Sequence, residues 1–262
     1  MRDTVVIGDV HGCGEELGEM FRRLRRWARD CQIVLIGDLL TKGPRPDLVV
    51  EHIQAERQAG RRIRLVCGNH EPRALAALRR AGPHGETARL PPKLAAMVEC
   101  LAESDLLDEA IVLLREAMGT MRVGGGSPRW HAIHAGVDPG LGVKDTPAKT
   151  LLSIKAAPDE SDWWWDYDGR DGLLVVGHKP LSRPLILRRN DGRAVVAAID
   201  TGCVYGGHLT AYRIRADRLL MIRSGQRRVF QFRRKVSRRP DESAWRVAGA
   251  ARDRTLVHSV SG

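Results

Sequence analysis

The stretch Thr4-Val5-Val6-Ile7-Gly8-Asp9-Val10-His11-Gly12 holds the pattern that decides the fold of this chain. A short run of apolar and β-branched residues ends at a glycine, and side chains that can bind a metal follow it. A run bounded in this way is typical of a buried strand. The pattern recurs over 33–38, 64–70, 173–178 and 197–202, and a related strand ends at His134. We therefore expect several buried strands that each deliver a polar side chain at the carboxyl end.

Helical segments separate the first three of these strands. Apolar residues recur at helical spacing at Leu17, Met20, Phe21, Leu24, Trp27 and Ala28, and a second helical pattern covers 48–59. Alternating strands and helices predict right-handed crossovers and a parallel sheet, whose ligands bind beyond the carboxyl ends of the strands. Residues 72–120 are expected to be mostly helical, with one helix over Asp108–Met118. Residues 195–222 alternate like antiparallel strands.

The composition is that of a globular protein, with 43% apolar and 29% charged residues among 262. No apolar run reaches the roughly 20 residues of a membrane span, so we expect no membrane contact. The chain passes directly from its first residues into a strand, and we expect no secretory leader. The five cysteines form no CxxC pair and are odd in number. This argues against a disulfide framework and favours a cytoplasmic location.

The positive charge is concentrated at the C-terminal end. Residues 223–262 hold 11 Lys or Arg against 3 Asp or Glu, whereas the whole chain has a net charge of +11. We expect one domain over 1–222 and a mobile basic tail over 223–262, with a final strand near 228–232. The tail could contact nucleic acid through phosphate groups, or it could serve only as a solubilising extension. The high pI therefore does not by itself indicate a nucleic-acid-binding protein.

Six side chains form a candidate metal site because each follows a predicted strand: Asp9, His11, Asp38, Asn69, His134 and His178. Carboxylate, imidazole and carboxamide donors without a thiolate suit Mn, Fe or Zn better than Ca or Mg. Six donors exceed the needs of one tetrahedral ion and suit two ions about 3.5–4 Å apart that share a carboxylate. Such a pair binds phosphate oxygens and lowers the pKa of a water that attacks phosphorus.

Five motifs occur in a fixed order: Gly8-Asp9-Val10-His11-Gly12, Gly37-Asp38 with Lys42-Gly43-Pro44, Gly68-Asn69-His70-Glu71, His134-Ala135-Gly136 and Gly177-His178. In order and spacing they resemble the calcineurin-like metallophosphoesterases, and among these the phosphoprotein phosphatase group. The segment 200–211, DTGCVYGGHLTA, is similar to that of symmetrical diadenosine tetraphosphatases and related bacterial phosphatases. The resemblance covers about residues 3–222. It implies a four-layer α/β/β/α sandwich with a helical insertion over 72–120.

The resemblance also implies a role for each matching residue. The first metal ion would be held by Asp9, His11 and Asp38, and the second by Asp38, Asn69, His134 and His178. The ions would be manganese, with iron, zinc or cobalt as alternatives. His70 would be the general acid that protonates the leaving oxygen. Two phosphate-binding arginines of the family correspond to Lys42, by motif, and Lys155, by spacing alone, with Arg170 as the rival for the second position.

Two departures from the family pattern bear on the substrate. Lysine keeps the charge of arginine but loses its two-pronged hydrogen bond, so we expect looser phosphate orientation. Thr41 stands where protein phosphatases usually have an aspartate that holds the acid histidine in its protonated form. Cleavage of a phosphoanhydride tolerates that loss better, because its leaving phosphate oxygen has a last pKa of roughly 6. A serine alkoxide is far more basic and needs the proton.

These features rank the functions that we expect. The first is symmetrical bis(5'-nucleosyl)-tetraphosphatase activity, the second is phosphatase activity on phosphoserine, phosphothreonine or phosphotyrosine in proteins, and the third is a low-activity protein that binds phosphate or RNA. The expected substrate partner is thus a nucleotide or a phosphoprotein. Trp163-Trp164-Trp165 with Tyr167 could stack a nucleobase, but packing in the core is the favoured interpretation.

Overall fold

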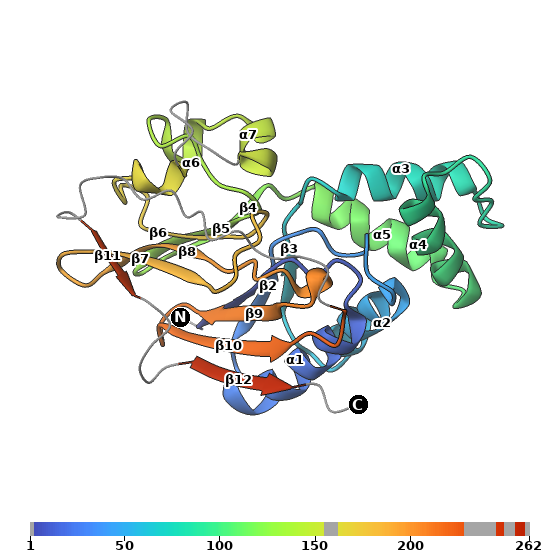
Figure 1. Ribbon diagram of the computed structural model, residues 1–262, viewed down its shortest axis with the longest axis horizontal. Helices are drawn as coiled ribbons and strands as arrows, with labels where there is room; N and C mark the ends of the chain where they lie inside the picture. The colour runs from blue at the N-terminus through green and yellow to red at the C-terminus, as the bar shows by residue number, and fades with distance from the viewer. Residues whose placement is uncertain (1–2, 155–161, 228–244, 249–254, 260–262) are drawn as a thin grey trace.

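A computed structural model describes residues 3–154, 162–227, 245–248 and 255–259. Within these ranges the chain forms two six-stranded sheets (Figure 1). The strand order of the first sheet is β12 (Thr255–Ser259), β10 (Arg218–Arg223), β9 (His208–Arg213), β1 (Thr4–Ile7), β2 (Gln32–Leu35) and β3 (Ile63–Leu65). That of the second is β11 (Trp245–Ala248), β7 (Leu185–Arg189), β8 (Ala194–Ala198), β6 (Leu173–Val176), β5 (Arg129–Ile133) and β4 (Arg122–Gly126).

Both sheets are mixed, and each contains three neighbouring parallel strands. In the first sheet β1, β2 and β3 run parallel, and β9 pairs antiparallel with β1. In the second sheet β5, β6 and β8 run parallel, flanked by antiparallel β4 and β7. The parallel strands of each sheet therefore end at a common edge, as the alternation of strands and helices predicted.

The side chains of the central strands alternate between two cores. Val5 and Ile7 of β1 face the helices beside the first sheet, whereas Val6 faces the second sheet. Leu174 of β6 faces outward and Val175 faces the first sheet. Because these strands are buried on both faces, they consist of continuous apolar runs rather than an alternating pattern.

Helices complete the outer layers of this α/β sandwich (Figure 1). Their bounds are α1 (Gly14–Trp27), α2 (Pro46–Gln58), α3 (Glu71–Ala81), α4 (Pro92–Glu103), α5 (Leu107–Met118), α6 (Gly142–Asp145) and α7 (Ala148–Ser153), with 3-10 turns η1 (Trp163–Trp165) and η2 (Cys203–Tyr205). The first five contribute to the core beside the first sheet, and the last two lie on the outer side of the second. The predicted helical insertion after β3 is confirmed by α3, α4 and α5.

The C-terminal region contains two strands that the sequence did not indicate. The strand β11 pairs antiparallel with β7, and β12 pairs parallel with β10, so each adds an edge strand to a different sheet. The strand expected near 228–232 lies outside the described residues. Within the described part of the chain, none of the helices has the length and apolarity that crossing a membrane requires.

Candidate active site

The six predicted donors meet where the parallel strands of both sheets end. Asp9 and His11 follow β1, Asp38 follows β2 and Asn69 follows β3, whereas His134 and His178 follow β5 and β6 of the other sheet. Two overlapping groups of possible metal-binding side chains occur here, and they include His70 as well as four of the six donors. Within each group, one atom per residue lies within 4.8 Å of the others: Asp9, Asp38 and His134 in one, and His11, Asp38 and His70 in the other. Asp38 thus belongs to both.

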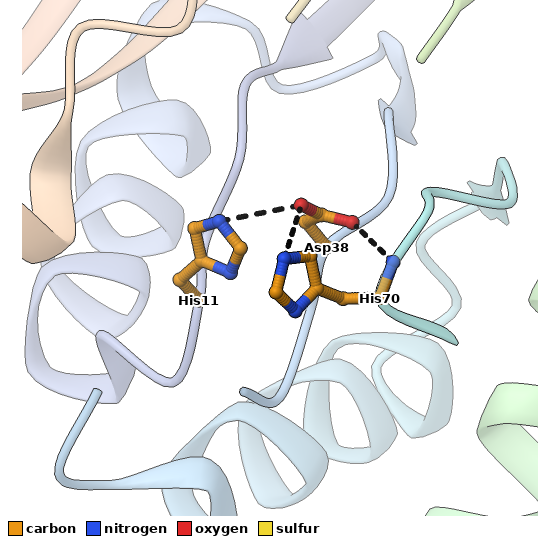
Figure 2. Close-up of side chains that lie close together, drawn as sticks. All are labelled: His11, Asp38 and His70. Carbon is orange, nitrogen blue, oxygen red and sulfur yellow. Dashed lines mark hydrogen bonds and ion pairs between the residues drawn. The ribbon is translucent and has the colours of Figure 1, made fainter. Parts of the chain in front are cut away.

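Asp38 lies at the centre of the second group (Figure 2). Its Oδ2 is 3.3 Å from Nε2 of His11 and 3.9 Å from Nε2 of His70. Its Oδ1 accepts a hydrogen bond of 2.9 Å from the backbone N–H of His70. The same Oδ1 is 3.6 Å from Nε2 of His134. One carboxylate therefore faces histidines that come from three different strand ends.

The remaining donors lie around His134. Its Nε2 is 3.0 Å from Oδ1 of Asn69 and 3.2 Å from Nδ1 of His178. Nδ1 of His134 lies 2.8 Å from the backbone oxygen of Ile36, which fixes the ring and turns Nε2 toward the other donors. The carboxylate of Asp9 accepts hydrogen bonds of 3.2 Å from the backbone N–H of His178, so the two sheets are joined at the site.

The electrostatics of this cluster fit a cationic ligand. Burial raises the pKa of Asp9 well above its usual value, and the carboxylates of Asp200 and Asp38 raise it further. Burial also acts to raise the pKa of Asp38, but His134, His11 and His70 lower it overall. Burial and the Asp38 charge raise the pKa of Asp200 to about 6. Several buried carboxyl groups among histidines are held in charged form when cations bind between them, so the donor set fits divalent metal ions.

Two of the glycines that precede donors make room for a neighbouring carboxylate. A Cβ atom at Gly68 would collide with Oδ1 of Asp38, and one at Gly177 would collide with Oδ1 of Asp9. Each glycine thus lets the donor of another strand approach the backbone, from the neighbouring strand at Gly68 and from the other sheet at Gly177. At these two positions the glycine before the donor has two roles. It ends the strand, and it leaves room for a carboxylate from another strand.

Strained backbone is concentrated at the site. Among the described residues, six that are not glycine have a positive φ, and four of them are His11, Asp38, Lys42 and His178. Such residues cost of order 1–3 kcal/mol each and persist only where the surrounding structure holds them. At His11 and Lys42 the restraint is visible, because the N–H of Gly43, next to Lys42, donates 2.8 Å to the oxygen of His11.

Glu71 holds the two donor loops of the first sheet together, a role that the sequence did not reveal. Its carboxylate is 1% exposed. Oε2 accepts from the backbone N–H of Asp38 (2.9 Å) and of Gly68 (2.7 Å), and Oε1 accepts from that of Leu39 (2.7 Å). Burial and the charge of Asp38 raise the pKa of Glu71 to about 7. One side chain thereby links the loop after β2 to the loop after β3.

His70, Thr41 and Lys42 lie at the edge of the donor cluster. Oγ1 of Thr41 lies 3.0 Å from Nδ1 of His70 and 3.2 Å from Nδ1 of His11, so this hydroxyl orients both rings. Burial lowers the pKa of His70, and Lys42 and Arg73 lower it further against the opposing charge of Asp38. Nζ of Lys42 lies 2.6 Å from Nε2 of His11. It also lies 5.6 Å from the ring centre of Tyr205 on η2.

The second predicted phosphate-binding residue is Lys155, with Arg170 as its rival. Lys155 lies outside the described residues. Arg170, its rival, precedes β6 whereas His178 follows it, so the four residues of this strand, about 13 Å, separate Arg170 from the site. Its guanidinium bonds Asp168 and the backbone of Gly140 instead. In this structure the Arg170 guanidinium thus has its partners outside the donor cluster.

The tryptophan cluster packs in the core. Trp163 and Trp164 are each 1% exposed and belong to the outer core of the second sheet with Tyr167. The packing interpretation is confirmed, and stacking of these rings on a nucleobase is excluded by their burial. Beside them, Nζ of Lys179 pairs with the buried carboxylate of Asp162. All five cysteines are free thiols.

The geometry agrees with comparisons to known proteins. The model of the calcineurin-like phosphoesterase family matches residues 3–221. The chain belongs to this family. Its members are hydrolases of phosphate esters and anhydrides, and the fold binds divalent metal ions. The predicted family, fold and enzyme class are thus confirmed.

Curated relatives of this phosphoesterase carry two related names. It is 29% identical over 250 residues to a bis(5'-nucleosyl)-tetraphosphatase PrpE [asymmetrical] of Halalkalibacterium halodurans, covering 84% of this chain and 94% of that one. It is 28% identical over 272 residues to a symmetrical bis(5'-nucleosyl)-tetraphosphatase of Janthinobacterium, covering 80% and 92%. Among solved structures, a metallophosphoesterase from Sphaerobacter thermophilus shares the fold with a TM-score of 0.51 and 19% identity, covering 86% of this chain and 89% of that one.

Proposed function

We propose that this phosphoesterase hydrolyses bis(5'-nucleosyl) tetraphosphates at a site that holds two divalent metal ions. The observation that carries the proposal is Asp38, whose Oδ2 faces His11 and whose Oδ1 faces His134, one ligand of each proposed ion. A carboxylate shared in this way is what a two-metal site needs. His70 lies beside the same carboxylate and Lys42 lies beside His11, where a phosphate group and its leaving oxygen would be bound.

In this proposal Asp9, His11 and Asp38 hold one ion, and the other donors with Asp38 hold the second, namely Asn69, His134 and His178. Manganese is the proposed metal, because oxygen and imidazole donors without thiolate suit it, with iron, zinc or cobalt as alternatives. When bound, two such ions polarise the phosphoryl group and activate the attacking water. The buried carboxyl groups and fixed histidine rings supply the frame for this chemistry.

The other residues act on the substrate directly. Lys42 offers a point positive charge to a phosphate oxygen, and its backbone is held by the turn that bonds Gly43 to His11. His70 faces the cluster through Nε2, while its Nδ1 is oriented by Thr41, and it would donate the proton to the leaving oxygen. Lys155 is proposed as a second phosphate-binding residue on its spacing alone.

The preference for a polyphosphate rests on Thr41 and on the relatives. A hydroxyl orients His70 but carries no charge to hold its proton, and a phosphate leaving group needs that proton less than an alkoxide does. The names of the relatives include both symmetrical and asymmetrical cleavage. We propose symmetrical cleavage to two nucleoside diphosphates, on the similarity of segment 200–211 to the symmetrical enzymes. The reducing cytoplasm, where nucleotides are found, is the proposed location.

The test is to give the manganese-loaded protein diadenosine tetraphosphate and a phosphoserine peptide in parallel and to separate the products. We expect the tetraphosphate to be hydrolysed faster, with ADP as the only nucleotide product. Equal amounts of ATP and AMP would change the assignment to asymmetrical cleavage. Faster hydrolysis of the peptide would favour the protein phosphatase alternative. Asp38→Asn is the control, because it keeps the shape of the shared ligand but removes its charge.

A further inference from the structure

We propose that a second anion site, which binds an oligophosphate chain, lies at the opposite end of the first sheet from the metal donors. A hollow of about 460 Å³ is lined there by the ends of α1 and α2 and by the residues that precede β2 and β3. Four of its lining residues are arginines: Arg25, Arg29, Arg61 and Arg62. The strands β2 and β3 begin at this hollow and end at the active site, so the two sites are separate. The inference does not depend on the proposed function.

The hollow has an excess of positive charge that the described residues do not neutralise. Its carboxylates are Asp30 and Glu56. Glu56 is buried and is shared by two guanidinium groups, with Arg25 at 2.5 Å and Arg61 at 3.5 Å. Within the described ranges, Arg29 and Arg62 form no ion pair. Arg29 and Arg62 are exposed, and they lie beside two arginines that share the single carboxylate of Glu56. This arrangement attracts an anion of more than one charge.

Arg61 lines one side of the hollow, and its guanidinium contacts neighbouring groups. Its side chain is 11% exposed, and Nη1 donates 3.2 Å to the backbone oxygen of Arg29, which joins the two helix ends. Nη2 is buried and has no hydrogen-bond acceptor within the described part of the chain. A buried donor without an acceptor costs about 1–3 kcal/mol, and rotation of the guanidinium toward an anion in the hollow would supply the acceptor. Above Gly60 the space is open, because a Cβ there would meet no atom within 4 Å.

The shape of the basic surface favours a chain of phosphates over a single one. A neighbouring hollow of about 280 Å³ is lined by Arg62, Arg64 and Arg215, so Arg62 belongs to both. Guanidinium groups therefore line two neighbouring hollows that share Arg62. One orthophosphate would contact only part of this set, whereas a tripolyphosphate, free or carried by a nucleotide, could contact arginines along its length.

The experiment is calorimetric titration of the full chain with inorganic tripolyphosphate, after metal removal by EDTA, in 0.15 M salt. The test variant is Arg29→Glu with Arg62→Glu, because both side chains are exposed and form no ion pair with a residue that the structure describes. The matched control is Arg79→Glu with Arg80→Glu, which makes the same change in net charge on exposed residues at the end of α3. Lys42→Ala tests whether the active site contributes to binding. Circular dichroism checks that every variant is folded.

We expect the wild type to bind tripolyphosphate, with Kd rising at least tenfold in the test variant and less than twofold in the control and in Lys42→Ala. An equal loss in both double variants would overturn the proposal, since it would show attraction to net charge only. Absence of binding at 1 mM, or loss of binding in Lys42→Ala, would also overturn it. Repeating the titration with ATP identifies the source of the phosphates: equal affinity supports the inorganic chain, and at least fivefold tighter binding supports a nucleotide.

Discussion

Replacing Glu71 by glutamine tests whether a single buried carboxylate holds the donor loops in place. The carboxylate presents only acceptors to three backbone N–H groups, those of Asp38, Leu39 and Gly68. Glutamine has one oxygen, and its NH2 group must face at least one of these donors. At least one hydrogen bond is then lost in a buried position, and two donors are brought together. The loss of one such bond with its donor left unsatisfied costs about 1–3 kcal/mol.

We therefore expect Glu71→Gln to lower the free energy of unfolding by about 1–3 kcal/mol, measured by urea denaturation of the metal-free protein. We also expect weaker manganese binding by calorimetry, because the loops that carry Asp38 and Asn69 lose their common anchor. Outer partners of metal ligands typically change metal affinity 10–100-fold when they are replaced.

The matched control is Glu116→Gln, an exposed carboxylate that pairs with Arg57 on the surface. An exposed ion pair contributes about 0–1 kcal/mol, so this variant should stay close to wild type. If Glu71→Gln unfolded within 0.5 kcal/mol of the wild type and bound manganese equally well, the role given to Glu71 would be refuted.

Substitutions at three further positions have defined outcomes. Gly177→Ala should reduce metal content and activity sharply, because the new Cβ collides with the Asp9 carboxylate, and normal metal content would contradict this packing argument. Lys42→Ala should lower kcat/KM by about 10–100-fold. Lys42→Arg should keep or raise kcat/KM, since a guanidinium can bind a phosphate with two hydrogen bonds. A kcat/KM equal to that of the wild type in the alanine variant would exclude Lys42 from substrate binding. Thr41→Asp should raise activity on a phosphoserine peptide relative to diadenosine tetraphosphate, because a carboxylate beside His70 favours the protonated form of this histidine. An unchanged ratio of the two activities would show that Thr41 does not determine the substrate preference.

The sequence predicted the position of the site because strand ends are local features. Asp9, Asp38 and His178 each follow an apolar run and a glycine, and parallel strands bring such residues to one edge of a sheet. The structure adds that the two sheets meet there, as shown by the contact of the Asp9 carboxylate with the backbone of His178. The helices α2 and α5 also lie within two residues of their predicted bounds, because their apolar spacing is regular.

Features that depend on contacts between distant residues could not be predicted in this way. Glu71 looks like an ordinary helix start in the sequence, and its partner Asp38 is 33 residues away. The positive φ of Lys42 follows from the crossing of its turn with the loop of His11, which no local pattern records. The short strands β11 and β12 lack a long apolar run, and their pairing with sheet edges is a tertiary effect.

The most direct test of the two-metal site is the metal content of the purified chain after manganese loading and removal of free ions. Elemental analysis should find two manganese ions per chain in the wild type. Asn69→Ala should retain about one, and Asp38→Ala should retain almost none, because Asp38 is the one residue proposed as a ligand of both ions. One ion or none in the wild type, or two ions in Asp38→Ala, would contradict the central claim that this shared carboxylate joins two metal positions.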